Sequence, residues 1–184
     1  MKYEHARALI CTGDCVAVST RTWGGAIIRF GQRVAGLRWH HYSHVGIAVS
    51  VVVAGEMRMC VAEMNQGGNN YRPLSQFVYD GCDVAIFEPP PGTDMQGLAS
   101  AIRDAQERHI PYGWLDLVPI GIQLVVRRFR GPVDVGGDGG ADRVCSFFAK
   151  LVYLLAGGRL PKTPYRPAPA ELLEDLTLKL TLEA

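Results

Sequence analysis

The hydrophobic residues of the chain follow two spacings, and each spacing predicts a different kind of element. A nearly continuous run of β-branched residues over 43–53 predicts a central strand. Turn formers at 54–56 and alternating residues over 57–64 predict that its hairpin partner follows directly. Shorter apolar runs predict three further strands, the last of them at a sheet edge, over 15–20, 83–88 and 177–182.

Apolar residues at intervals of three and four predict the helices. The clearest pattern lies in 143–158, where one apolar face is followed by two glycines that end the helix. A second helix is predicted over 93–109, with Thr93 as its N-cap. Shorter helical segments are predicted over 23–34, 73–78 and 169–176, the last with proline near its start, and turn formers predict a loop over 66–70.

This order of elements predicts an α+β fold, in which a small antiparallel sheet, partly barrel-like, packs against helices. The 184 residues, 48% hydrophobic and 20% charged, fit one globular domain spanning 1–184. A net charge of +1 provides no basic field for binding nucleic acid. No run of about 18 apolar residues is present, so no transmembrane segment is predicted. No signal peptide is visible, and a cytoplasmic protein is therefore expected.

One cysteine lies where a reactive thiol is favoured. The five cysteines form an odd set, which argues against a secreted disulfide framework. Cys145 falls in the first turn of the helix predicted in 143–158, where unpaired amide groups and the helix dipole favour a thiolate. His44 opens the central strand and is the candidate base, since an imidazole can take and return a thiol proton. Glu63, on the partner strand, falls near the same end of the hairpin and is the candidate to orient His44.

The same residues also fit ordinary structural roles. A buried cysteine at a helix start often serves as a small core residue, and a histidine at a strand start often serves as a cap. His40 and His41 accompany His44, but neighbours on an extended chain point to opposite faces, so no metal site is predicted. No cofactor is predicted either. The residue types alone leave the catalytic and the structural interpretations both open.

Five motifs, taken together and in order, resemble a known family. They are Gly13-Asp14-x-Val16, Tyr42-Ser43-His44-Val45-Gly46-Ile47, Val61-Ala62-Glu63, Pro111-Tyr112-Gly113 and Cys145-Ser146 at the head of an apolar helix. This pattern, over about residues 12–157, resembles the circularly permuted papain-like hydrolases of the NlpC-type superfamily. Within that superfamily the pattern resembles the YiiX-like branch, which is related to the lecithin retinol acyltransferase group. The histidine strand precedes the cysteine helix in that family, opposite to the order in papain.

The resemblance implies roles for particular residues. It implies Cys145 as the nucleophile, His44 as the base and Glu63 as the orienting group. Tyr42 and Tyr112 are implied as residues that line the pocket or donate to an oxyanion, although both also fit ordinary packing. This sequence departs from the family where Phe147 follows Cys-Ser, a place where the family often has a small or acidic residue. Asp14 is expected to brace the first turn and not to be catalytic.

The implied activity is that of a cysteine amidase or peptidase working through an acyl-enzyme, on a peptide of the peptidoglycan type. In a cytoplasmic protein, such an activity would require lysis or a non-classical route to the wall. A thioesterase or lipid acyltransferase is an alternative, with the apolar segment 115–129 as acyl groove or lid. A non-catalytic binding module that keeps the fold is another. The substrate is thus expected to be a peptide or an acyl compound, and the sequence does not predict the oligomeric state.

Overall fold

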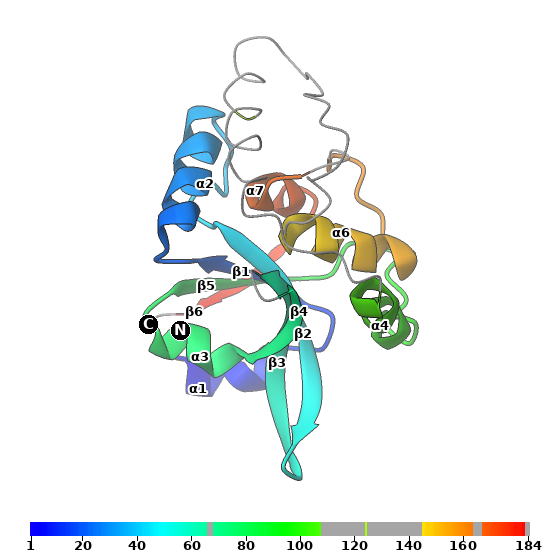
Figure 1. Ribbon diagram of the computed structural model, residues 1–184. Coiled ribbons are helices and arrows are strands. Elements are labelled where there is room, and N and C mark those ends of the chain that lie inside the picture. The colour runs from blue at the N-terminus through cyan, green and yellow to red at the C-terminus, as the bar shows by residue number, and fades with distance from the viewer. Residues whose placement is uncertain (66–67, 108–123, 125–144, 164–166, 183–184) are drawn as a thin grey trace.

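The computed structural model describes residues 1–65, 68–107, 124, 145–163 and 167–182 (Figure 1). These residues form one six-stranded sheet with the order β4-β3-β2-β1-β5-β6. Each neighbouring pair of strands is antiparallel. The strands are β1 (Cys15–Ser19), β2 (His44–Val53), β3 (Glu56–Asn65), β4 (Gly68–Pro73), β5 (Asp83–Phe87) and β6 (Leu178–Leu182).

Helices surround this sheet. Helix α6 (Cys145–Leu155) packs on β2 and β3, and α4 (Leu98–Glu107) packs beside it. Helix α3 (Leu74–Tyr79) contacts β3 and β5 from the other side of the sheet, as Figure 1 shows. The remaining segments are α1 (Tyr3–Ala6), the 3-10 turn η1 (Arg7–Leu9), α2 (Trp23–Val34) and α7 (Pro169–Leu173). The predicted α+β fold, an antiparallel sheet packed against helices, is confirmed.

The alternation of side chains along the strands divides the core into two layers. Val45, Ile47 and Val49 of β2 lie in the layer that contains α6, together with Phe148. Ala48 of the same strand lies in the opposite layer, with residues of β1, β5 and α3. Successive side chains of a strand point to opposite faces. His44 comes one residue before Val45, so its side chain belongs to the face opposite α6. It is also the first residue of β2 and therefore lies at the end of the strand.

The C-terminal end of α6 is closed as predicted from the two glycines. Gly157 has a positive φ of 78°, which a residue without a Cβ adopts at little cost. Its N–H donates to the carbonyl of Leu154 at 3.1 Å, and the N–H of Gly158 donates to the carbonyl of Tyr153 at 2.8 Å. These two hydrogen bonds form a Schellman motif, which satisfies the last carbonyls of the helix. At its other end, α6 begins at Cys145.

Two predictions about the elements are wrong, and in both cases other contacts outweigh local propensity. The helix predicted from Thr93 begins at Leu98. Thr93 does not cap it, because its hydroxyl donates to the carbonyl of Pro90 and Asp94 accepts from the N–H of Gln96 in a turn of its own. Within the predicted loop 66–70, β4 begins at residue 68 and pairs with β3 over its whole length. Cross-strand pairing decides the conformation there.

The other predicted elements agree with the structure to within a few residues. The strand predicted over 177–182 is β6 at the sheet edge, and the helix predicted over 169–176 is α7, which ends at Leu173. The apolar segment 115–129 lies outside the described residues apart from Leu124, which is buried. Among the helices of the described chain, none has the length and apolar character needed to cross a membrane.

Candidate active site

The hairpin of β2 and β3 brings His44 and Glu63 together. Ile47 pairs with Ala62, so the same register places Glu63 opposite Gly46, two residues from His44 and on the same face. The Nε2 atom of His44 lies 2.5 Å from Oε2 of Glu63. Both side chains are buried, with His44 8% and Glu63 1% exposed. This is a short, water-excluded contact between an imidazole and a carboxylate.

A glycine between these strands makes the contact possible. A Cβ on Gly46 would lie 2.4 Å from Cγ1 of Val61 and 2.8 Å from the carbonyl oxygen of Ala62. It would also lie 3.3 Å from the Cβ of Glu63. The strands therefore approach closely only because Gly46 has no side chain. That approach leaves the space in which the Glu63 carboxylate reaches back to His44.

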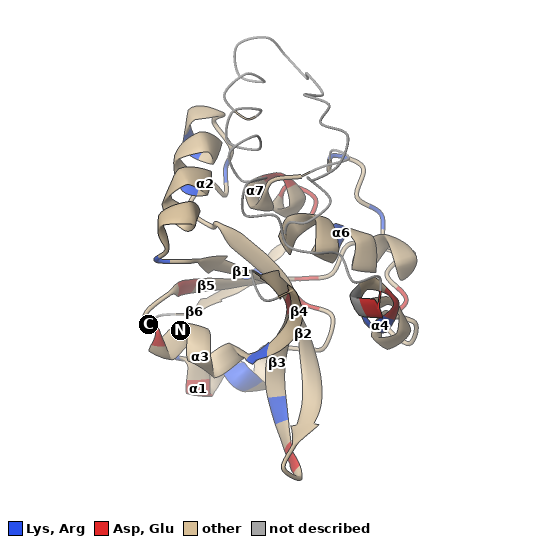
Figure 2. Cartoon of the chain, viewed as in Figure 1, with Lys and Arg blue, Asp and Glu red and all other residues tan. Residues whose placement is uncertain are grey.

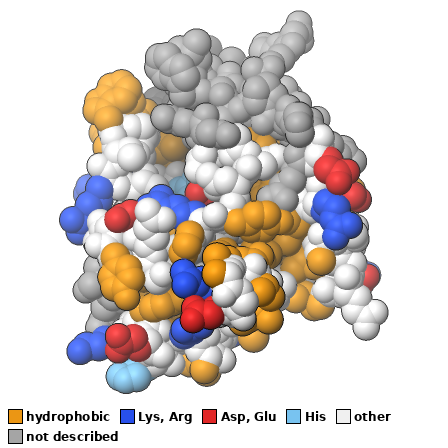
Figure 3. All heavy atoms as spheres, turned by 60° about the horizontal axis from the view of Figure 1, so that its bottom comes forward, with side chains coloured by type: hydrophobic (Ala, Val, Ile, Leu, Met, Phe, Trp, Pro, Cys, Tyr) orange, Lys and Arg blue, Asp and Glu red, His pale blue; other side chains and the backbone are white. Residues whose placement is uncertain are grey.

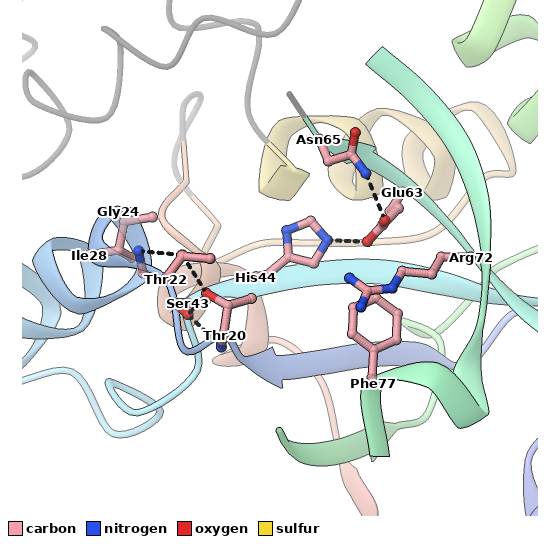
Figure 4. A pocket seen from close by; sticks show the side chains of 11 residues that line it. Thr20, Thr22, Gly24, Ile28, Ser43, His44, Glu63, Asn65, Arg72 and Phe77 are labelled. Atoms are coloured by element: carbon pink, nitrogen blue, oxygen red, sulfur yellow. Dashed lines mark hydrogen bonds and ion pairs between the residues drawn. The ribbon is translucent and has the colours of Figure 1, made fainter. Parts of the chain in front are cut away.

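Cys145 approaches the same imidazole from the other layer of the core. It is the first residue of α6 and is buried. Interaction with the Cys145 side chain raises the pKa of His44, so the two side chains lie close to each other. Since Nε2 of His44 faces Glu63, Nδ1 is the ring nitrogen left for the thiol, and Figure 4 shows it on the side of the ring away from Glu63. The start of a helix and the start of a strand thus meet at one end of the sheet.

The electrostatics of this site favour a charged imidazole. Burial by itself lowers the pKa of His44, but interactions with Cys145 and with Glu63 outweigh it and raise the pKa to about 10. For Glu63, burial raises the pKa, yet the hydrogen bond and charge of His44, the amide of Asn65 and the charge of Arg72 together lower it. A carboxylate next to an imidazolium is therefore the stable arrangement at neutral pH.

Asn65 binds the second oxygen of the Glu63 carboxylate, Arg72 adds a positive charge that lowers the pKa of Glu63, and sequence reasoning missed both. The Nδ2 atom of Asn65 donates to Oε1 of Glu63 at 3.0 Å. Arg72 stacks over the ring of Phe77, 4.1 Å from its centroid, and pairs with Asp80. The two-residue spacing from Glu63 on one strand was a signal for Asn65. No comparable signal existed for Arg72. It lies on β4, and the first half of that strand falls in the segment predicted as a loop.

A pocket of about 390 Å³ opens beside His44 and Glu63, and Cys145 is not among the residues that line it. Arg72 and Phe77 lie on one side of it, as Figure 4 shows. On the other side Thr20 and Ser43 are joined by a hydrogen bond of 2.9 Å between their hydroxyls. The remaining lining residues are Thr22, Gly24, Gly25, Ile28 and Asn65. The pocket therefore offers a substrate a preformed space directly beside the imidazole.

Comparison with known proteins bears on the fold. The fold resembles that of a metalloprotein. The crystal structure of YiiX from Escherichia coli O157:H7 superposes with a TM-score of 0.51 and 16% sequence identity, covering 95% of this chain and 99% of that chain. Neither protein-family models nor curated proteins give a match to this sequence. At this level of identity the likeness to YiiX is one of fold alone.

YiiX is described as a metalloprotein, and the present chain can be tested for a similar site. Among the described residues, no group of three or more His, Cys, Asp or Glu side chains is arranged to hold a metal ion. The nitrogen and oxygen atoms of His44 and Glu63 that face each other are engaged in their mutual contact. The described part of the chain therefore does not fit a metal ion, and no step below uses one.

The remaining residues singled out in the sequence have separate positions. Tyr42 is buried against Trp39 and Phe87, and burial raises its pKa to about 12. It does not appear among the residues that line the pocket, and its role toward a substrate stays a prediction. Tyr112 lies outside the described residues. Asp14 accepts from the backbone N–H of Cys11 at 2.8 Å, which is the expected brace of the first turn.

Proposed function

We propose that this chain is a cysteine hydrolase with a circularly permuted papain-like fold, in which Cys145 is the nucleophile, His44 the base and Glu63 the orienting group. The observation that carries the proposal is that one imidazole contacts a buried carboxylate and lies within electrostatic reach of the Cys145 side chain. A nucleophile, a base and a group that orients the base are the parts that thiol catalysis requires. The similarity of the fold to that of YiiX supports the assignment to the YiiX-like branch.

The proposed reaction begins with attack of the Cys145 sulfur on the carbonyl carbon of an amide. The carbonyl oxygen becomes an oxyanion, for which the backbone N–H of Cys145 at the start of α6 is a suitable donor. The His44 imidazolium gives its proton to the amine as the C–N bond breaks, and a thioester remains. Water then attacks the thioester, His44 takes a proton from the water and returns it to the sulfur, and the carboxylic acid leaves.

Glu63 has a fixed part in this sequence. Its contact with Nε2 keeps Nδ1 turned toward Cys145, so that the proton moves along one defined path. Its negative charge also stabilises the imidazolium that exists before attack and again after the water is activated. Asn65 holds the carboxylate by its other oxygen and so keeps Glu63 from rotating away from the ring.

The proposed substrate is an amide bond in a peptide of the peptidoglycan type. The pocket beside His44 has room for a side chain of such a peptide and contains both hydroxyl groups and a guanidinium group, from Thr20, Ser43 and Arg72. Polar groups of this kind bind peptide carbonyl and carboxylate oxygens. The family resemblance favours a peptide of this type over an acyl compound.

The experiment incubates the protein with stem peptides released from peptidoglycan and identifies products by mass spectrometry. The wild-type chain is expected to cleave one amide bond, and Cys145→Ala is expected to show no cleavage above background. Cys11→Ala removes an exposed thiol at a distance from the site and is the matched control. Equal activity of wild-type protein and Cys145→Ala would refute the proposed chemistry.

Parallel substrates test the substrate class. Aryl esters and acyl thioesters are offered under the same conditions to the same variants. Cleavage of esters or thioesters that depends on Cys145, without cleavage of any peptide, would retain the chemistry and reassign the substrate to the acyl class. Failure of the folded wild-type protein to turn over any of these would favour a binding module.

A further inference from the structure

Helix α2 presents an apolar stripe to the solvent. Its buried residues, among them Ile28 and Gln32, face the protein. On the opposite side, Trp23 is 77% and Phe30 68% exposed. With 100° per residue, positions 23, 27, 30 and 34 fall within one narrow sector of the helix, and all four are apolar, with Trp23 and Phe30 exposed and Ile27 and Val34 half-buried. The side of α2 that points away from the protein thus carries two exposed aromatic rings, and Figure 3 shows hydrophobic side chains at this corner.

The formally charged side chains of the segment that carries this stripe are all arginines. Residues 15–55 contain four arginines and not one Asp or Glu. Arg29 is turned inward, toward the carbonyl of Thr20 and the hydroxyl of Ser43. Arg21, Arg33 and Arg38 are exposed near the helix or at its ends, and Figure 2 shows basic but no acidic positions on α2. A neighbouring segment brings an acidic residue to this surface, because Glu174 accepts a hydrogen bond from the backbone N–H of Arg38.

We propose that the α2 stripe, consisting of Trp23, Ile27, Phe30 and Val34 with the exposed Arg21, Arg33 and Arg38, binds the surface of an anionic lipid bilayer. Tryptophan and phenylalanine insert among lipid headgroups and acyl chains, and arginine pairs with lipid phosphates. A helix lying in the membrane plane needs this combination of an apolar stripe with basic flanks.

A second copy of the chain is the main competing occupant, and the charges disfavour it. In a symmetric dimer, the same surface of each copy would face the other, so each α2 would bring its arginines against those of its partner. Like charges opposed in this way weaken an interface. An anionic lipid surface turns the same arginines into an attraction.

Lipid binding through the α2 stripe would also affect the pocket beside His44. Thr22, Gly24, Gly25 and Ile28 of α2 line the pocket beside His44. The helix that binds lipid is therefore also a wall of that pocket. Binding through α2 would bring the entrance of the site to the lipid–water boundary, where membrane-attached substrates present their carbonyl groups. The lipid-binding surface itself does not depend on the function proposed above.

Co-sedimentation with vesicles tests the proposal. Wild-type protein is expected to sediment with vesicles that contain phosphatidylglycerol and to remain in solution with vesicles of phosphatidylcholine alone. Trp23→Ser and Phe30→Ser together are expected to lower the partition constant by at least about tenfold. Raising the salt from 0.1 to 0.5 M is expected to weaken binding several-fold, because the arginine term is screened. Tyr79→Ser removes an aromatic ring that is 81% exposed elsewhere, and it is the matched control.

Three outcomes would overturn the proposal. The first is no sedimentation of the wild-type protein with either kind of vesicle. The second is equal binding by the wild-type protein and the variant with both substitutions, with circular dichroism showing both to be folded. The third is a dimer in sedimentation velocity without lipid that the two substitutions dissociate, which would assign the stripe to a second copy. Peptide or ester cleavage is measured separately, so loss of lipid binding with intact turnover leaves the proposed function standing.

Discussion

The pKa of His44 is the quantity through which Glu63 acts, and Glu63→Gln tests this directly. The variant keeps the shape of the side chain and removes the charge that faces Nε2 at 2.5 Å. A hydrogen bond to a charged group contributes about 1.5 to 3 kcal/mol. One pH unit corresponds to 1.36 kcal/mol. The substitution is therefore expected to lower the pKa of His44 from about 10 by about one to two pH units.

The pKa can be measured for this one residue by NMR. The ring carbons of the five histidines are labelled, and the signal that is absent from the His44→Gln spectrum is followed with pH. Glu56→Gln is the matched control, because it removes an exposed glutamate from the same strand, away from the site. A wild-type His44 that titrates at the ordinary 6.5, or a titration that Glu63→Gln leaves in place, would refute the reasoning.

The same shift has a consequence for stability. The folded state raises the pKa of His44 above its value of about 6.5 in an unfolded chain, so the charged form favours folding. This contribution is fully present below pH 6.5 and is lost as the pH rises through about 10. The difference in unfolding free energy between wild-type protein and Glu63→Gln should accordingly be larger at pH 7 than at pH 10.5, as urea unfolding at the two pH values measures.

Three further substitutions test the framework around the site. Gly46→Ala forces two strands apart and is expected to lower the unfolding free energy by about 1 to 3 kcal/mol; an unchanged urea midpoint would contradict the close approach. Asp14→Ala removes the buried acceptor of Lys179, 2.9 Å away, and is expected to cost about 2 to 3 kcal/mol in urea unfolding, with Asp14→Asn costing less. Tyr153→Phe removes one hydrogen bond, of 2.9 Å to the carbonyl of Gly13, and a loss of about 1 kcal/mol is expected from thermal unfolding.

Local sequence patterns predicted the elements that carry the candidate site. The β-branched run that became β2 and the apolar helix that became α6 both have strong periods of their own. His44, Glu63 and Cys145 could be chosen because each lies near an end of such an element or near a predictable hairpin position. The meeting of β2 and α6 at one end of the sheet had no local signal, and the family resemblance is what implied it.

The features that were missed depend on contacts between distant residues. Strand β4 consists largely of turn-forming and polar residues, and it is a strand because β3 offers it a partner. Arg72 comes near enough to lower the pKa of Glu63 only through that pairing, so it could not be placed beforehand. Helix α4 likewise begins later than predicted, because the residues at Asp94 form a turn and not the first turn of the helix. The rest of the fold decides between these two local structures.

Formation of a thioester on Cys145 is the most direct test of the proposed chemistry. The protein is mixed with an excess of a p-nitrophenyl ester, release of nitrophenol is followed in the first turnover, and the quenched protein is digested and mapped by mass spectrometry. The account predicts a burst of one equivalent, an acyl group on the peptide that contains Cys145, and neither signal in Cys145→Ala. A burst that survives in Cys145→Ala, or an acyl group found only on another residue, would contradict the assignment of Cys145 as the nucleophile.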